Sequence, residues 1–149
     1  MELRPLRAGD IDAFAPWLSR AASDARCERW PDEATLRNAA GEKQVLACVE
    51  NGPHALLEYA TDAPVAGAAQ VRFLAVAPDH RRLGTGGRAA LALERRLRRS
   101  ARAIYVRVPE HLGLALYFWL RLGYRPLTQR DWPVAPGDGA ATWMVRELG

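Results

Sequence analysis

The feature that most restricts the fold of this sequence is a glycine-rich turn between an expected strand and an expected helix. An apolar run ends at Ala77-Pro78, and Gly84-Thr85-Gly86-Gly87 then opens the helical segment. Three glycines within four residues let the backbone turn tightly and approach a ligand closely. The first N–H groups of the helix are free and lie at the positive end of its dipole. The segment therefore predicts an anion-binding site.

The charge of the chain is concentrated around this turn. Of the 149 residues, positions 81–107 carry nine Arg and one Glu, a local net charge of +8, whereas the remaining residues carry a net charge of −4. Arg81, Arg82 and Arg88 surround the glycines, and so many cations indicate a diphosphate as the ligand. The outer arginines, from Arg95 to Arg102, are interpreted either as a solvated helix face or as a surface that attracts anions.

Hydrophobic periodicity and turn residues predict one mixed α/β domain over residues 1–149. Asp10 is expected to cap the first helix, and Asn51-Gly52-Pro53 predicts a hairpin. Gly41 and Gly123 are expected just beyond helix ends. The expected strands cover residues 2–6, 44–50, 54–60, 66–77, 103–108, 124–127 and 141–147, and the expected helices cover 11–18, 31–40, 88–99 and 112–122.

Two common phosphate-binding motifs do not fit the turn. A P-loop needs a lysine directly after its glycines, and the only lysine is Lys43. A dinucleotide-binding fold needs G-x-G-x-x-G/A, which Gly84, Gly86 and Ala89 satisfy. In that fold, however, the strand runs almost directly into the first glycine, and here seven residues separate Val76 from Gly84. The acidic ribose ligand expected about 20 residues later is missing as well.

A third pattern fits the turn and its surroundings. The residues Arg81-Arg82-Leu83-Gly84-Thr85-Gly86 match R/Q-x-x-G-x-G/A, within the longer run LAVAPDHRRLGTGGRAAL. A later run, LALYFWLRLGYRP, is an apolar helix that ends in Leu-Gly-Tyr. Over nearly its whole length the sequence thus resembles the GNAT superfamily of N-acetyltransferases. The resemblance implies a single-domain α/β fold, with a mixed, mostly antiparallel sheet of six or seven strands flanked by about four helices.

The resemblance also implies a reaction and its substrates. Acetyl-CoA is the cosubstrate, and its acetyl group passes to a primary amine of a small molecule or a protein by direct attack. The implied cofactor-binding residues fall into three groups. The pyrophosphate is held by the backbone amides of Leu83, Gly84, Thr85, Gly86, Gly87 and Arg88, beside Arg81 and Arg82. The pantetheine arm pairs with Leu74, Ala75 and Val76, where the N–H of Val76 polarises the thioester carbonyl, and Trp119 is added from the late helix.

The sequence departs from the family pattern where protons are handled. The position of the usual Glu base holds Gln70, and the position of the usual Tyr acid holds Trp119. Leu112 replaces the Asn that often precedes that Tyr. Neither Gln nor Trp exchanges a proton usefully near neutral pH.

Two other residues are candidates for the proton transfers. Tyr117 becomes the acid if the helix register shifts, with Glu110 then in the Asn place; its alternative is an aromatic of the core or of an interface. Glu58, beside Tyr59, is the candidate base, and its alternative is a solvated hairpin carboxylate.

The sequence also allows two other interpretations of function. One is a catalytically degenerate GNAT domain that binds acyl-CoA as a sensor or interaction module, favoured by Gln70 and Trp119. Another is an RNA- or ribosome-associated protein that uses the arginine face, although no nucleic-acid recognition motif is present. Trp30, Trp132 and Trp143 are candidates for an acceptor pocket or for packing, and the last two also for a homodimer contact.

Composition excludes several classes of site and compartment. The histidines show no metal-ligand spacing, and Cys27 and Cys48 are too few for a cysteine metal site, so no metal is expected. The longest stretch without Asp, Glu, Lys or Arg has ten residues, against about 20 needed for a membrane span. A charged N-terminal segment without an apolar region predicts no secretory signal and a cytoplasmic protein.

Overall fold

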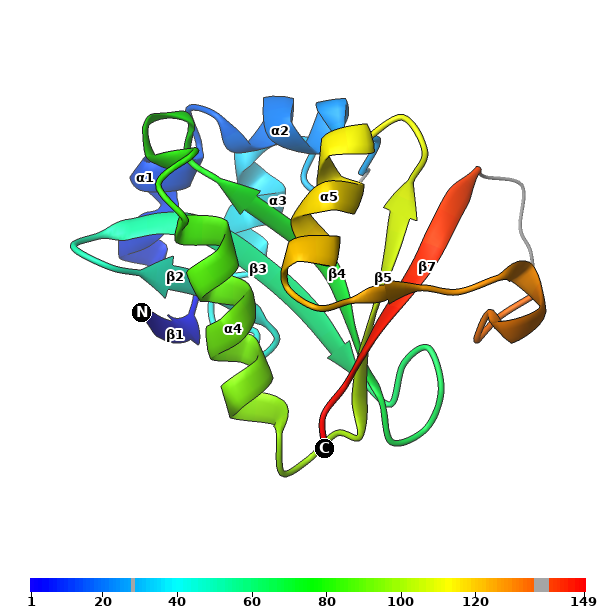
Figure 1. The fold of residues 1–149 in the computed structure, drawn as a ribbon. Coiled ribbons are helices and arrows are strands. Elements are labelled where there is room, and N and C mark those ends of the chain that lie inside the picture. The colour runs from blue at the N-terminus through cyan, green and yellow to red at the C-terminus, as the bar shows by residue number, and fades with distance from the viewer. Residues whose placement is uncertain (28, 136–139) are drawn as a thin grey trace. The chain divides into compact units, whose positions relative to one another are not determined.

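The computed structural model describes residues 1–27, 29–135 and 140–149. Its seven strands form a mixed sheet in the order β1-β2-β3-β4-β5-β7-β6 (Figure 1). The β4–β5 pair is parallel, whereas β1–β2, β2–β3, β5–β7 and β6–β7 are antiparallel. The expected α/β fold with a mostly antiparallel sheet is thus confirmed. The strands are β1 (Glu2–Pro5), β2 (Val45–Val49), β3 (Pro53–Thr61), β4 (Ala69–Val76), β5 (Ala103–Pro109), β6 (Arg125–Pro126) and β7 (Ala141–Glu147).

The described residues form five α-helices, where about four were expected. The first expected helix, over residues 11–18, ends at Phe14, because Pro16 has no N–H to donate to the preceding turn, and the helix Leu18–Asp24 that follows was not expected. The glycine-rich helix also begins three residues earlier than expected, at Thr85. The helices are α1 (Ile11–Phe14), α2 (Leu18–Asp24), α3 (Glu33–Asn38), α4 (Thr85–Leu97) and α5 (Gly113–Arg121), with 3-10 turns η1 (Ala8–Asp10), η2 (Pro78–His80) and η3 (Gln129–Asp131).

The chain forms two compact units, and the first consists of residues 1–58 and 73–93. In this unit α1, α2 and α3 pack their apolar side chains against one face of β2 and β3. Its fully buried residues include Phe14, Leu36 and Leu56, and Trp30 packs against Phe73 with 6.3 Å between ring centroids. The opposite face of the same two strands is buried too, at Leu46, Cys48, Ala55 and Leu57. Strands buried on both faces form a fixed support for the segments that follow them.

The second unit consists of residues 59–72 and 94–149. Its centre is the β5–β7 ladder, which extends from Ala103 opposite Glu147 to Pro109 opposite Ala141. Ile104 and Met144 are fully buried on this ladder. Glu94 is buried as well and forms ion pairs with Arg98, at 3.6 Å, and Arg146, at 3.5 Å. At the end of α5, Gly123 has φ +91°, as expected for a glycine beyond a helix.

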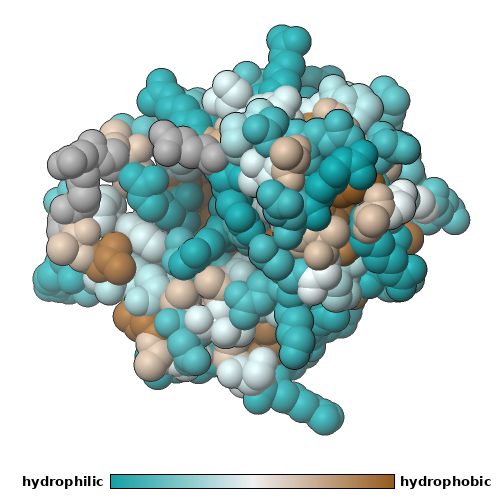
Figure 2. All heavy atoms as spheres, turned by 180° about the vertical axis from the view of Figure 1, so that it is seen from behind, coloured by the Kyte–Doolittle hydropathy of each residue, from teal (hydrophilic) through white to brown (hydrophobic). Residues whose placement is uncertain are grey.

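Most residues on the surface are hydrophilic. In the view of Figure 2, apolar residues appear singly or in small groups among polar ones. The large apolar side chains that are exposed in the described residues are Leu83, Leu91, Leu114, Tyr117, Leu120 and Val134. Scattered apolar residues of this kind are normal on a protein surface, whereas the position of Leu83 beside the glycines is relevant to the site below.

Asp10 occupies the N-cap position of α1, as expected, but its side chain does not cap that helix. Its carboxylate makes no capping hydrogen bond to α1. Instead it accepts two bonds from the guanidinium of Arg4, at 2.6 and 2.9 Å, and one from the backbone N–H of Arg7, at 2.9 Å. The hydrogen bonds from Arg4 hold the pKa of the Asp10 carboxyl below its usual range. This buried pair joins β1, which carries Arg4, to the start of the helical segment, which carries Asp10.

We predict that Asp10→Asn lowers the free energy of unfolding by about 2 kcal/mol near pH 7, since it leaves the half-buried Arg4 without its carboxylate. A carboxyl whose pKa falls on folding stabilises the fold above its unfolded pKa of about 3.9, and that contribution disappears as the pH falls through the folded pKa. Urea unfolding should thus show the difference shrinking below about pH 4. Asp12→Asn, at an exposed position, is the control. A constant difference from pH 7 to pH 3 would contradict the assignment.

Candidate functional site

The candidate site is the turn between β4 and α4, in the first unit. After β4 ends at Val76, η2 leads into a reversal with two left-handed residues, Arg82 at φ +65° and Gly84 at φ +79°. The first hydrogen bond of α4 runs from the N–H of Arg88 to the carbonyl of Gly84, at 3.0 Å. The amides of residues 85–87 therefore precede the helical ladder and lie at the positive end of the dipole. This is the arrangement that binds anions at helix N-termini.

Gly84 suits the turn by its backbone angle and leaves room for the side chain of Arg88. A Cβ at this position would lie 2.8 Å from Nη1 of Arg88, closer than real side chains pack. The positive φ adds strain for any residue with a side chain. The glycine therefore lets the guanidinium of Arg88 lie directly against the turn.

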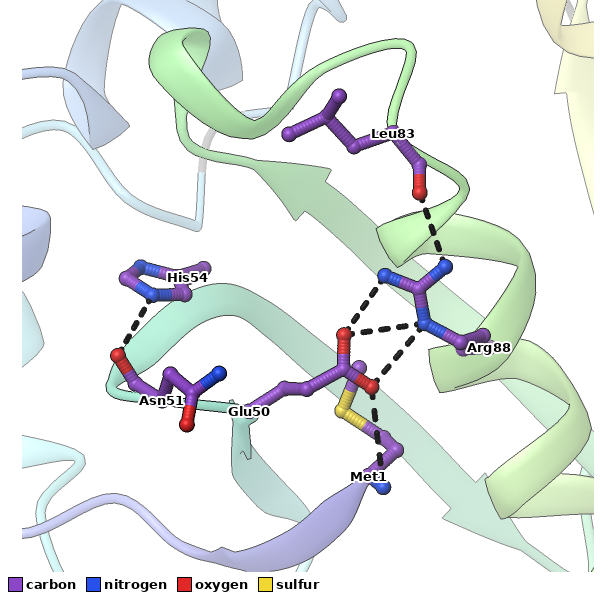
Figure 3. A network of polar contacts seen from close by, with 6 residues as sticks. All are labelled: Met1, Glu50, Asn51, His54, Leu83 and Arg88. Atoms are coloured by element: carbon purple, nitrogen blue, oxygen red, sulfur yellow. Dashed lines mark hydrogen bonds and ion pairs between the residues drawn. The ribbon is translucent and has the colours of Figure 1, made fainter.

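The three arginines of the motif have different contacts. Arg81 donates from Nε to the carbonyl of Val76, at 3.1 Å, and so ties the turn to the end of β4. Arg88 donates from Nη1 to the carbonyl of Leu83, at 2.8 Å, and from Nε and Nη2 to the carboxylate of Glu50 (Figure 3). The Arg82 side chain is exposed. The structure thus brings the predicted cations and the glycines together in one segment.

The strand before the turn, β4, extends beyond its ladder with β5. The parallel ladder to β5 covers Ala69–Val71 of β4, and the strand continues for five residues beyond it, to Val76. The last three of these, Leu74, Ala75 and Val76, are half-buried. The next residue, Ala77, donates its N–H to the carbonyl of His54 on β3, at 2.8 Å. The end of β4 is therefore held at a fixed position directly before the turn.

Two stacked histidines, His54 and His80, lie beside the turn. The rings of His54 and His80 are stacked, with 3.5 Å between centroids and 12° between planes. His54 also bonds through Nε2 to the carbonyl of Asn51, at 3.0 Å. His80 directly precedes Arg81, so its ring packs η2 against the start of β3. This contact gives His80 a structural role in the turn.

The aromatic candidates on α5 belong to the second unit and differ in burial. Tyr117 is 62% exposed, which excludes the core alternative for this residue. Trp119 is 5% exposed and contacts the rings of Phe118 and Tyr124 edge-on, at 4.9 and 4.8 Å. Burial raises the pKa of the Tyr124 phenol well above its usual range, so this hydroxyl stays protonated. The roles assigned to Tyr117 and Trp119 stay predictions.

Glu58, the candidate base, is engaged in an ion pair. Its carboxylate accepts from Nε of Arg29 at 3.0 Å, and the same guanidinium binds Glu42 at 2.9 Å. The Arg29 guanidinium therefore lies against the carboxylate that would have to accept the proton of the amine. The catalytic role of Glu58 also stays a prediction.

The tryptophans considered for an acceptor pocket are largely packing residues. Trp30 is 1% exposed and Trp143 is 4% exposed. Trp143 packs edge-on against Tyr105, with 6.5 Å between centroids. Trp132 is half-buried and donates its indole N–H to the carbonyl of Leu127, at 3.1 Å.

One residue of the site has no signal in the sequence. Glu50 directly follows β2 and precedes the Asn51-Gly52 turn, 38 residues before Arg88. Nothing in the neighbouring sequence distinguishes it from a solvated hairpin carboxylate. Only the packing of the hairpin beside α4 places the two side chains together.

The structure shows no metal site: in the described parts of the chain no three His, Cys, Asp or Glu side chains are arranged to hold a metal ion. Over the same residues, the structure contains no helix with the length and apolar character to cross a membrane.

Comparisons with known proteins identify the class of this fold and site. The family model for the acetyltransferase (GNAT) family matches residues 11–124, and the chain therefore belongs to the GNAT acetyltransferases. No curated protein matches the sequence. Among solved structures, a GNAT acetyltransferase from Staphylococcus aureus is similar with a TM-score of 0.73 and 13% identity, over 99% of both chains.

Two further structures have the same fold. The ribosomal-protein-S18-alanine N-acetyltransferase from Escherichia coli gives a TM-score of 0.65 at 22% identity, over 99% of this chain and 93% of that chain. NAA60 from Arabidopsis thaliana, solved in complex with acetyl-CoA, gives a TM-score of 0.64 at 14% identity, over 98% of both chains. At these identities the likeness concerns the fold.

The burial of the two cysteines, Cys27 and Cys48, determines whether a thiol could take part in acyl transfer. Cys48 is fully buried on β2, and burial raises the pKa of its thiol to about 12. Cys27 is half-exposed. We predict that iodoacetamide at pH 8 alkylates Cys27 in the folded protein and leaves Cys48 unmodified, because the thiolate is the reactive form. Peptide mass spectrometry reads out both sites, with the urea-unfolded chain as the control in which both react. Rapid labelling of Cys48 in the folded protein would contradict its burial.

Proposed function

We propose that residues 1–149 act as one acetyl-CoA-dependent N-acetyltransferase domain, which transfers an acetyl group to a primary amine in a ternary complex. The observation that carries the proposal is the turn at Gly84, where free amides, a helix N-terminus and three arginines occur in one segment. Membership of the acetyltransferase family and the acetyl-CoA complex of NAA60 support the choice of anion.

The residues of the turn suit the diphosphate of acetyl-CoA. The amides of Leu83, Gly84, Thr85, Gly86 and Gly87 are assigned to its oxygens, which would gain charge-assisted hydrogen bonds there. The amide of Arg88, which the family resemblance also implied, donates to the carbonyl of Gly84 instead. Arg82 is exposed and Arg88 retains N–H groups beyond its internal bonds, so both are assigned to the same anion. Because Gly84 has no side chain, the ligand can approach the backbone closely.

The end of β4 is assigned to the acyl end of the cosubstrate. Leu74, Ala75 and Val76 continue beyond the ladder to β5, so an extended pantetheine arm can pair with their backbone. The N–H of Val76 is assigned to the thioester oxygen, where it stabilises the charge that develops as the amine attacks. Arg81, bonded to the Val76 carbonyl, keeps this peptide in place.

The reaction forms one bond and breaks another. The amine nitrogen attacks the thioester carbonyl carbon, the carbon–sulfur bond breaks, the CoA sulfur leaves as thiolate, and the amine loses one proton. With Gln70 where the family has a base, we infer that positioning of the two reactants supplies most of the acceleration. The acceptor then arrives neutral or passes its proton to water, and Tyr117 is the proposed acid for the thiolate.

The proposal is tested by binding and turnover on the same protein. Calorimetry should give saturable binding of acetyl-CoA, and release of free thiol should accelerate with one member of a panel of amines, peptides and polyamines. Absence of binding would overturn the proposal. Binding without turnover on any acceptor would overturn the transferase activity and support the acyl-CoA-binding module instead.

We predict that Gly84→Val weakens acetyl-CoA binding by about tenfold or more, because the side chain displaces Arg88 and covers the amides, and each lost charge-assisted bond has that effect. Gly41→Val is the matched control: Gly41 has φ +91°, but nothing lies within 4 Å of its missing Cβ. Both variants should lose about 2 kcal/mol of unfolding free energy through backbone strain. Equal affinity of the two variants for acetyl-CoA would place the phosphate site elsewhere.

A further inference from the structure

The carboxylate of Glu50 holds the guanidinium of Arg88 through three hydrogen bonds. Nε of Arg88 is 3.0 Å from both carboxylate oxygens of Glu50, and Nη2 is 2.6 Å from Oε1 (Figure 3). Glu50 lies at the β2–β3 turn and Arg88 in the first turn of α4, so the pair joins the hairpin to the candidate site. It is a two-point contact, which fixes the orientation of the guanidinium plane as well as its position.

Counting donors shows what the pair leaves available. A guanidinium has five N–H groups. Glu50 takes the one on Nε and one on Nη2, and the carbonyl of Leu83 takes one on Nη1 at 2.8 Å. One N–H on Nη1 and one on Nη2 therefore remain. These two N–H groups are the donors that Arg88 can still offer to the oxygens of a phosphate.

Without Glu50 this orientation would not be maintained. Arg88 lies at the positive end of the α4 dipole, which disfavours a cation in the first turn. Its side chain is 44% exposed and has several rotatable bonds, so it would otherwise extend into solvent. The carboxylate compensates the dipole and keeps the guanidinium against the turn, where Gly84 leaves room for it.

Glu50 is itself held in place. Its N–H donates to the carbonyl of Gly52, at 3.0 Å, within a turn where Asn51 has φ +58° and Gly52 has φ +118°. The N-terminal ammonium lies 3.8 Å from its Oε2. The hydrogen bonds from Arg88 keep the pKa of the carboxyl below its usual range, so Glu50 stays ionised near neutral pH.

We propose that Glu50 is a positioning residue of the cosubstrate site, which orients Arg88 so that its two remaining N–H groups bind a phosphate of acetyl-CoA. The inference rests on the proposed function. It adds a residue of the β2–β3 turn, outside the glycine motif, to the determinants of cosubstrate affinity.

A double-mutant cycle measured by calorimetry with CoA tests this inference. Glu50→Gln should raise the Kd for CoA about threefold to tenfold, since the uncharged amide loses the ion pair and holds the guanidinium less firmly. In the Arg88→Ala background the same change should have no effect, because no guanidinium remains to be oriented. Acetyl-pantetheine, which has no diphosphate, should bind the wild type and Glu50→Gln equally. Glu33→Gln, which removes a carboxylate from the exposed pair with Arg37, is the matched control and should bind CoA like the wild type.

Each other result would count against the inference. An unchanged or lower Kd in Glu50→Gln, with normal binding by the wild type, would overturn the positioning role alone and leave the proposed function in place. An equal loss with and without Arg88, or an equal loss for acetyl-pantetheine, would assign Glu50 to the stability of the hairpin. Failure of the wild type to bind CoA would overturn both proposals. Thermal unfolding of every variant verifies that the fold is retained.

Discussion

The reversal of the chain between β4 and α4 is the constraint on which the rest of the site depends. Two residues, Arg82 and Gly84, adopt left-handed backbone angles, and the helix begins directly afterwards. This geometry turns the amides at the start of α4 toward the ligand side and places Arg88 one turn into the helix. A different path at either residue would direct the helix dipole elsewhere and separate the cations from the amides.

Much of the fold was predictable because its signals are local. Glycine positions, apolar periodicity and the Asn51-Gly52 hairpin depend on residues close in sequence, and the structure has these elements where they were expected. The capping hydrogen bond expected from Asp10, which the structure does not have, could not be judged from local signals. A capping carboxylate and a carboxylate paired with Arg4 look the same in sequence, and the choice depends on where β1 places the arginine.

For the candidate site, too, the sequence predicted the local motif but not its distant partners. The glycines and arginines of the turn form a contiguous pattern, so a candidate anion site could be predicted from the sequence alone. The partners of those residues did not, since Glu50 reaches Arg88 from 38 residues away and Arg29 reaches Glu58 from 29 residues away. Such pairs follow from tertiary packing. They also change which groups are accessible, because the carboxylate of Glu58, which looks unpaired in the sequence, is bonded to the guanidinium of Arg29.

The choice of cation around the turn has a consequence for a protein that would bring a reactive acetyl thioester to amines. Twenty of the 21 basic side chains are arginine, and Lys43 is the one lysine. A guanidinium stays protonated at any physiological pH and is a poor nucleophile, whereas a lysine amine is an acceptor for acetyl transfer. If the chain binds acetyl-CoA as proposed, the positive charge around the donor comes from groups that the donor does not acetylate, and the exposed Lys43 is the one lysine open to self-acetylation.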